Sequence, residues 1–402
     1  MSVDSSVCLQ ELPDLVFYQI LDQLDIHDIL LSLRRVSRHF YNIVNSYNRL
    51  KLKIISTSPR AGIHRISRTV QSGNVLSISL MNTMEWNQWN GVQVFVSLNN
   101  LSQYTCLRSL SLFYIDMDVL ENMLQEVTSL PALVSLTIEP GKINNLIERL
   151  AMLLSSAIAR SNLRKLSLYA MCGYISRISW SKQCKLKELF LDSCSHNHIC
   201  HILDQLPNLE TFTTHDYWLP IAETPIVLTS IHLLTSLKLY CMQIPIGLLE
   251  SLLSYMPALV HLHLSTYFTT FYFLQRLSQW EYLIHEKLPV LDTFKLYAST
   301  EQYQYEDVKD IESMFNRFRT PFWLELKRWY ITCEYVKDGN TSNIRLYSRK
   351  DSHRNFPAKS SPAMLTHSAS TTRNDDITDM SGFKPRTTLK TDTKYYRMSM
   401  EY

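Results

Sequence analysis

The amino-acid sequence predicts an α/β protein in which a short N-terminal module of three helices precedes a solenoid of strand–helix units. Residues 9–47 have the three- and four-residue apolar spacing of helices. The pattern Leu-x-x-Leu-x-Leu then recurs between residues 107 and 296 at intervals of roughly one structural unit. Such a unit is too small to bury its own apolar face, so neighbouring units stack. We expect a horseshoe with parallel strands on its concave side and helices on its convex side.

Composition and charge indicate a globular intracellular protein. The 402 residues are 46% hydrophobic and 19% charged, which allows a sizeable core. The net charge of +3 is too small to indicate a nucleic-acid or membrane partner, and no stretch reaches the ~18 apolar residues of a membrane span. The first residues, MSVDSSVCLQELPD, do not resemble a secretory signal, so we expect the eight cysteines to be reduced thiols in the cytoplasm or nucleus.

The N-terminal module has the start and cap signals of three helices. Pro13 suits the first turn of a helix, because its missing N–H would be unpaired there. Asp25 is a candidate N-cap for the second helix and Ser37 for the third. Three short helices give a marginal core. We therefore expect the module to complete its core against a partner or the adjoining domain, although it could also be only the helical cap of the solenoid.

These residues resemble the F-box family. The family motif runs Leu-Pro, an acidic residue, a Leu pair, Ile-Leu, Leu, Asp-Leu, Leu and Val-Cys/Ser-Arg-x-Trp/Phe. This chain reads Leu12-Pro13-Asp14-Leu15-Val16, Ile20-Leu21, Leu24, Asp28-Ile29, Leu33 and Val36-Ser37-Arg38-x-Phe40. The resemblance implies docking on a Skp-type adaptor and, through it, on a cullin. The adaptor-binding residues that it implies are Leu12, Pro13, Leu15, Ile20, Leu21, Leu24, Ile29, Leu33, Val36 and Phe40.

The repeats resemble the degenerate leucine-rich repeats that follow F-boxes. Helical spacing between the predicted strands, and Leu-Pro or Met-Pro before several of them, complete each strand–helix unit. The apolar triplets are Leu107-Leu110-Leu112, Leu133-Leu136-Ile138, Leu163-Leu166-Leu168, Leu186-Leu189-Leu191, Leu209-Phe212-Thr214, Leu234-Leu237-Leu239, Leu259-Leu262-Leu264 and Leu291-Phe294-Leu296. The fifth is the weakest, because Phe212 and Thr214 replace leucines.

The remaining boundaries follow from composition. We predict a module over 1–48, a linker with the first degenerate repeats over 49–106, repeats over 107–298, a capping segment over 299–347 and a disordered tail over 348–402. Within the linker, 50–55 should be a strand and the polar segment 57–74 a loop. In the capping segment, 307–319 should be helical, and 322–326 and 329–333 should be strands that close the edge of the last repeat.

Strand alternation predicts which side chains line the concave face. Aromatic and imidazole side chains are prominent at these positions, and exposed aromatics in register are enriched at recognition surfaces. They could instead pack on one another or under loops. The candidate client-binding residues are Phe113, Tyr169, Phe190, His215, Tyr240, His261, His263 and Tyr297.

One cluster could be chemical, Cys194-Ser-His196-Asn-His198-Ile-Cys200-His201. Thiolates and imidazoles bind zinc, but this spacing is not an established zinc pattern. Cys194 falls where the repeat consensus places Asn or Cys, and Cys200 falls on an apolar helix stripe, so we favour a structural role. Glycine-rich phosphate loops and hydrolase motifs do not occur. We expect no metal, no cofactor and no catalytic residue.

The F-box and repeats together resemble substrate receptors of Skp–cullin–F-box ubiquitin ligases. This resemblance implies that the repeats hold a client protein while a separate enzyme modifies it. Two alternatives stay open. One is an F-box scaffold that binds or localises a partner without driving ubiquitination, and the other is an enzyme with an unrecognised site in the Cys/His cluster.

Overall fold

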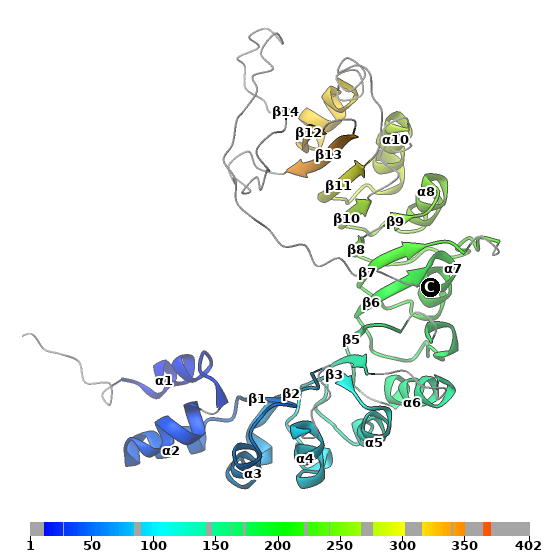
Figure 1. The fold of residues 1–402 in the computed structure, drawn as a ribbon. Helices are drawn as coiled ribbons and strands as arrows, with labels where there is room; N and C mark the ends of the chain where they lie inside the picture. Colours follow the sequence, from blue (N-terminus) through cyan, green and yellow to red (C-terminus); the bar gives the residue numbers. More distant parts are fainter. Residues whose placement is uncertain are drawn as a thin grey trace, which may run out of the picture. The chain divides into compact units, whose positions relative to one another are not determined.

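The computed structural model divides the chain into two compact units, residues 1–193 with 205–209 and residues 194–204 with 210–402. Each unit combines a sheet with helices (Figure 1). The structure describes residues 12–26, 28–83, 90–141, 147–160, 162–171, 174–220, 224–240, 242–266, 276–301, 316–338, 341–349 and 365–370.

The N-terminal module consists of two α-helices joined by short, irregular turns. Helix α1 spans Asp14–Leu21 and α2 spans Arg38–Ser46. The predicted second helix is present as a π-helical turn, η2 (Asp28–Ser32), followed by a 3-10 turn, η3 (Leu33–Arg35). The predicted cap of the third helix is confirmed, since the Ser37 hydroxyl accepts a 3.3 Å hydrogen bond from the Phe40 N–H.

The first unit continues with a parallel sheet in chain order. Its strands are β1 (Leu50–Ile55), β2 (Val75–Met81), β3 (Ser109–Ile115), β4 (Ser135–Pro140), β5 (Lys165–Leu168) and β6 (Glu188–Ser195). Helices α3 (Arg60–Thr69), α4 (Gly91–Leu98), α5 (Met117–Val127) and α6 (Ile147–Arg160) lie along one side of the strands (Figure 1). Short 3-10 turns occur at η4 (Ser72–Asn74), η5 (Leu101–Gln103) and η6 (Ile175–Arg177). This arrangement is consistent with a repeat solenoid.

Helix α3 corrects the prediction of a loop over 57–74. Pro59 directly precedes the helix, and Ile63 and Ile66 are 1% and 0% exposed. Two isoleucines three residues apart lie on the same side of a helix. Their burial stabilises the helix although the segment is otherwise polar, because tertiary packing supplies most helical stability in proteins.

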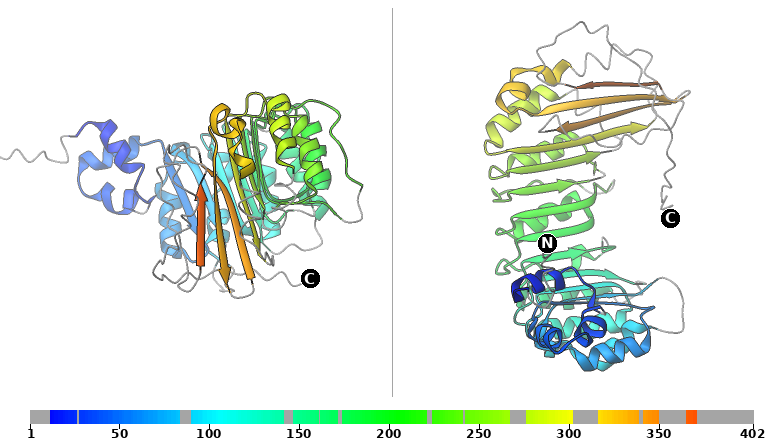
Figure 2. Two further views of the ribbon diagram at one scale, coloured as in Figure 1. Left: turned by 90° about the horizontal axis from the view of Figure 1, so that it is seen from above. Right: turned by 90° about the vertical axis from the view of Figure 1, so that its left-hand side faces the viewer.

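The second unit begins with helix α7 (His196–Gln205) and continues with a largely parallel sheet. Strands β7 (Thr211–Trp218), β8 (Ser236–Leu239), β10 (His261–Thr266) and β11 (Thr293–Glu301) are parallel neighbours in that order, and β9 (Met242–Gln243) pairs with β7. Figure 2 shows these strands side by side. Helices α8 (Ile246–Ser254) and α10 (Leu277–Lys287) cover one face of them.

Burial confirms the predicted strand register in both units. Every apolar position of the eight triplets has at most 3% of its surface exposed. This includes Phe212 and Thr214 of the weak fifth repeat, both 0% exposed, where the Thr214 hydroxyl donates to the Asp216 carbonyl at 3.1 Å. A buried hydroxyl without such a partner would be costly, so this hydrogen bond explains why threonine is tolerated.

The C-terminal elements differ from the prediction. Residues 322–326 form a π-helical turn, η8 (Phe322–Leu326), after a 3-10 turn, η7 (Arg317–Arg319). A strand would place residues 322, 324 and 326 on one face. The structure instead buries Trp323 against Phe294 and Trp329, with ring centroids 6.0 and 6.1 Å away, and leaves Leu326 62% exposed.

Strand pairing also corrects the predicted end of the sheet. Strand β12 (Tyr330–Asp338) matches the predicted strand at 329–333, but β13 (Thr341–Arg349) is the direct antiparallel neighbour of β11. Strand β12 pairs with β13 and with β14 (Leu365–Ser370), which lies inside the predicted disordered tail. Backbone pairing needs no apolar periodicity, so a strand can form in a segment whose composition is typical of a disordered tail. The predicted helix at 307–319 falls largely on residues outside the described ranges.

No helix in the described ranges combines the length and the apolar character needed to cross a membrane.

Candidate functional site

The N-terminal module has a small core built from all of its helical segments. Phe17 of α1 and Phe40 of α2 pack edge to face with ring centroids 5.3 Å apart. Both are nearly fully buried. The other core residues are Leu21, Ile26, Ile29, Leu30, Ile43, Val44 and Tyr47.

Four aliphatic residues of the same module point away from this core. Leu15 is 68% exposed, Val36 65%, Leu24 39% and Ile20 37%. We call these four residues the exposed aliphatic set. All four are predicted adaptor-binding residues, and exposed aliphatic side chains of this size on a small folded module indicate a docking surface.

The other predicted adaptor-binding residues divide into two groups. Pro13 is exposed, and Leu12 and Leu33 are half-buried. Leu21, Ile29 and Phe40 are at most 3% exposed, so they stabilise the module and are not available for direct contact. Phe17 is a core residue that the family motif does not include. Apolar spacing predicts that it lies on a helix, but spacing alone does not show which side of so short a helix is buried.

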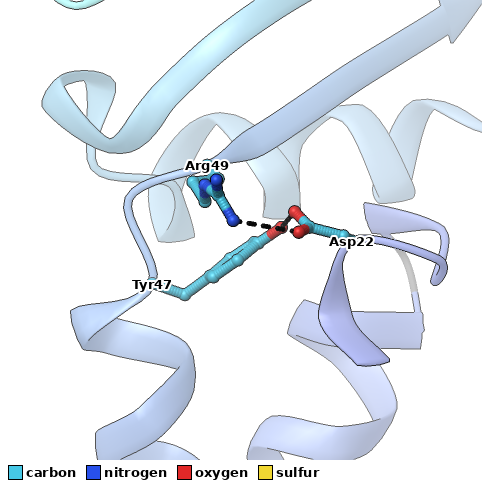
Figure 3. A network of polar contacts seen from close by, with 3 residues as sticks. All are labelled: Asp22, Tyr47 and Arg49. Carbon is cyan, nitrogen blue, oxygen red and sulfur yellow. Dashed lines mark hydrogen bonds and ion pairs between the residues drawn. The ribbon is translucent and has the colours of Figure 1, made fainter. Parts of the chain in front are cut away.

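A polar network ties the C-terminal ends of helices α1 and α2 to the first strand. The Tyr47 hydroxyl donates to Asp22 Oδ1 at 2.6 Å, and Arg49 donates to Asp22 Oδ2 at 3.0 Å (Figure 3). Burial, followed by the hydrogen bond to the Asp22 carboxylate, raises the pKa of Tyr47 far above its usual value. The network therefore joins the end of α1, the end of α2 and the residue that precedes β1.

The strand face is the side of each sheet opposite its helices. In the first unit it carries three aromatic rings that pack on one another. Tyr169 lies between Phe113 and Phe190, with ring centroids 6.4 and 4.7 Å away. All three are half-buried. These predicted client-binding residues are thus held by mutual packing and still present part of their surface.

A second aromatic group lies on the strand face of the second unit. Tyr240 packs edge to face against His215 and His263, with centroids 5.4 and 4.7 Å away. The Tyr240 hydroxyl and His263 Nδ1 are 3.2 Å apart. Burial lowers the pKa of His263, and the positive charges of Lys295 and Lys238 lower it further. Of the remaining candidates, His261 is exposed and Tyr297 is half-buried.

The Cys/His cluster forms structural contacts in the second unit. His196 Nε2 is 2.9 Å from the Ile226 carbonyl, which can only accept, so His196 donates there. Its Nδ1 then accepts from the Tyr217 hydroxyl at 2.6 Å. Burial lowers the pKa of His196 and raises that of Cys200 to about 11, so the neutral forms of both are favoured.

The described residues contain no group of three or more His, Cys, Asp or Glu side chains arranged to hold a metal ion. Cys106, Cys184, Cys194 and Cys200 are free thiols. His196 uses one ring nitrogen to hold the chain at Ile226 and the other to hold Tyr217, which is a structural role.

Comparison with known families agrees with the module geometry. The model of the F-box domain matches residues 9–52. The chain therefore carries an F-box domain, and domains of this family generally bind Skp-type adaptors. Proteins with such a domain are generally non-enzymatic substrate adaptors. No curated protein matches the chain.

Proposed function

We propose that this protein is a substrate receptor of a cullin-type ubiquitin ligase. Residues 9–52 tether it to a Skp-type adaptor. The repeats are leucine-rich repeats, and their strand face holds a client protein. A separate enzyme of the complex then modifies the client. This protein contributes a high effective concentration of client near that enzyme, and none of its side chains reacts.

The observation that carries the proposal is the exposed aliphatic set within the F-box match. Leu15 and Val36 are each about two-thirds exposed, although the surrounding module is well packed. Complete burial of one such side chain contributes about 1.5–3 kcal/mol. The exposed fractions of the four residues add up to about two complete side chains, so a partner that covers them would gain about twice that amount, before the costs of association.

The strand face supports the second half of the proposal. Its side chains alternate with the buried side chains of the repeat pattern, so that the backbone holds them in rows across adjacent strands. Half-buried aromatics on rigid strands bind at a low cost in conformational entropy, because packing already restricts their rotamers.

The test of adaptor binding uses charges placed on exposed positions. Leu15→Glu with Val36→Glu should reduce adaptor pull-down by about tenfold or more, because buried carboxylates without partners are costly. The melting temperature should stay unchanged, since both side chains are exposed. Met152→Glu on α6, also 65% exposed, is the matched control and should bind normally. Full binding by a folded double variant would exclude the F-box surface as the tether.

The rate of client degradation distinguishes the substrate-receptor proposal from the scaffold alternative. Wild type and the Leu15/Val36 double variant are purified by affinity from cells with inhibited proteasomes. The double variant should retain the client and lose the adaptor. A receptor then predicts that deletion of the protein slows turnover of the retained client. Unchanged turnover would favour a scaffold that binds or localises its partner.

A further inference from the structure

A row of basic side chains crosses the strand face of the second unit. The strand register places His263 of β10 beside Lys238 of β8 on one side and Lys295 of β11 on the other. Adjacent strands are about 4.8 Å apart, so three basic residues fall within about 10 Å along one line. We call Lys238, His263 and Lys295 the basic row.

The basic row lacks compensating carboxylates at neighbouring face positions. Where strands β7, β8, β10 and β11 pair with one another, no face position holds Asp or Glu. Glu301 ends β11, six residues beyond Lys295. Asp292 precedes β11 and has the opposite alternation, and Asp216 lies beyond the part of β7 that pairs with β8. Among the described residues, neither Lys238 nor Lys295 makes an ion pair. Apart from the basic row, the face positions hold hydroxyl, imidazole and tyrosine side chains, namely Thr211, Thr213, His215, Ser236, Tyr240, His261, Ser265, Thr293 and Tyr297.

The strand face of β4–β6 in the first unit has the opposite character. It holds Glu139, Glu188 and Asp192 against a single cation, Lys165. Lys165 pairs with Glu188 at 3.0 Å, so its charge is compensated. The positive character of the second face is therefore not a general property of the strands of this protein.

The side chains of the basic row are held where they can reach one ligand. Lys238 is half-buried on the strand face, and Lys295 is exposed. His263 is oriented by its contact with the Tyr240 hydroxyl and by the packing of the two rings. The lowered pKa of His263, caused mainly by burial and then by Lys295 and Lys238, agrees with an electropositive environment that an anion would relieve.

We propose that the strand face of β7, β8, β10 and β11 binds an acidic peptide segment of the client, whose Asp and Glu carboxylates contact the basic row. The half-buried hydroxyl side chains beside the row, those of Thr213 and Thr293, can donate further hydrogen bonds to the same carboxylates. The inference rests on the proposed function, since it specifies the chemistry of the client that the repeats hold.

A peptide fits this face better than a nucleic acid does. Binding to a phosphate backbone relies on many lysines and arginines along a stripe. This face offers only two lysines and no arginine, next to histidines and half-buried Tyr240 and Tyr297, in a chain with a net charge of only +3. A short acidic segment with adjoining apolar residues matches both its charge and its aromatic surface.

The test measures binding of a short fluorescein-labelled peptide of alternating Glu and Ser to the full chain by fluorescence anisotropy. The matched Gln/Ser peptide should not bind, and rising salt should weaken binding of the Glu/Ser peptide. Lys238→Gln with Lys295→Gln should weaken binding about tenfold or more. Lys238→Arg with Lys295→Arg should retain it, because the charge is kept.

The control variant removes the same charge elsewhere. Lys51 and Lys53 are exposed on β1. Lys51→Gln with Lys53→Gln should leave peptide binding unchanged. Equal losses in the two double variants, or no loss at Lys238 and Lys295, would overturn the proposal. So would equal binding of a single-stranded oligonucleotide of the same charge, or binding of only a phosphoserine peptide.

Failure of this inference can be told apart from failure of the proposed function. The Lys238/Lys295 double variant should melt normally and keep full adaptor pull-down, because the lysines lie outside residues 9–52. Loss of peptide specificity with intact adaptor binding would refute only the acidic-client inference. Absence of adaptor binding in the wild type would refute the proposed function, whatever the peptide does.

Discussion

The F-box module and the repeat strands use the same aliphatic residues in different ways. In the strands, the consensus leucines are at most 3% exposed, and the neighbouring face positions are polar or aromatic. In the module, Leu21 is 1% exposed while Leu15 and Val36 remain about two-thirds exposed. The repeats complete their core within the chain. The module completes only part of its own, so its remaining aliphatic surface is available to a partner.

The largest effect is expected in a repeat strand. Leu189→Ala in β6 should lower the free energy of unfolding by about 2–5 kcal/mol, because Leu189 is 1% exposed and its removal leaves a cavity. Denaturant unfolding measures the change.

Glu188→Ala on the same strand is its control. The ion pair of Glu188 with Lys165 joins two half-exposed side chains, so the change should stay within about 0–1 kcal/mol. Similar losses at Leu189 and Glu188 would contradict the assigned strand register.

A smaller effect is expected where the module joins the first strand. Tyr47→Phe removes the 2.6 Å hydrogen bond to Asp22 and should cost about 1–3 kcal/mol, since hydrogen bonds to charged groups are among the stronger ones. Tyr18→Phe removes an exposed hydroxyl contact with Ser46 at 3.1 Å and should cost less. Thermal melts of the two variants compare the contacts. A larger loss for Tyr18→Phe would show that the Asp22 network does not anchor the module.

Acidification should destabilise the second unit through His196. Burial lowers its pKa from an ordinary value of 6.5, so the unfolded chain binds more protons than the folded chain in this range. Stability is therefore fully present above about pH 6.5 and falls as the pH drops toward the lower folded pKa. Protonation also removes the acceptor at Nδ1 that receives the Tyr217 hydroxyl.

Thermal melts at neutral and mildly acidic pH measure this effect. The drop in melting temperature should be smaller in His196→Gln than in wild type. His201→Gln, an exposed change on the same helix, should leave the drop unchanged. If His196→Gln shows the full wild-type drop, other groups carry the pH dependence.

The smallest effect on stability is expected at Leu15. Leu15→Ala should change the free energy of unfolding by no more than about 0.5 kcal/mol, because the side chain is 68% exposed. Leu21→Ala in the same helix should cost about 2–5 kcal/mol, because Leu21 is buried. Unfolding measurements of the pair test the comparison within one helix. A large loss for Leu15→Ala would mean that Leu15 belongs to the core.

Local sequence patterns predicted much of the fold because each repeat packs mainly against the repeats next to it in the chain. A leucine two positions from the next lies on the same side of a strand, so the Leu-x-x-Leu-x-Leu pattern predicted burial through Phe294 and Leu296. The helix cap at Ser37 could also be predicted, because it depends on a hydrogen bond between residues three positions apart. Where local composition and tertiary packing disagreed, as at Ile63 and Ile66 of α3, the local prediction was wrong.

The two candidate surfaces depended on contacts between distant residues. The motif named ten adaptor-binding residues, but core and surface aliphatics look alike in a short helix. Only tertiary packing separated buried Leu21 from exposed Leu15. Likewise, alternation predicted that Lys238, His263 and Lys295 each lie on the strand face. Only the strand pairing showed that they lie side by side in one row.

The periodicity of the chain alone thus predicted the helical module, the repeats and the buried side of each repeat strand. These features follow from backbone geometry over a few residues, so each apolar residue of the pattern predicts its own burial. Tertiary structure decided which aliphatic residues of the module stay exposed and which charged residues of separate strands lie side by side. Both depend on distances between residues far apart in the chain, such as Phe17 to Phe40 and Lys238 to Lys295, and a single sequence carries no record of those distances.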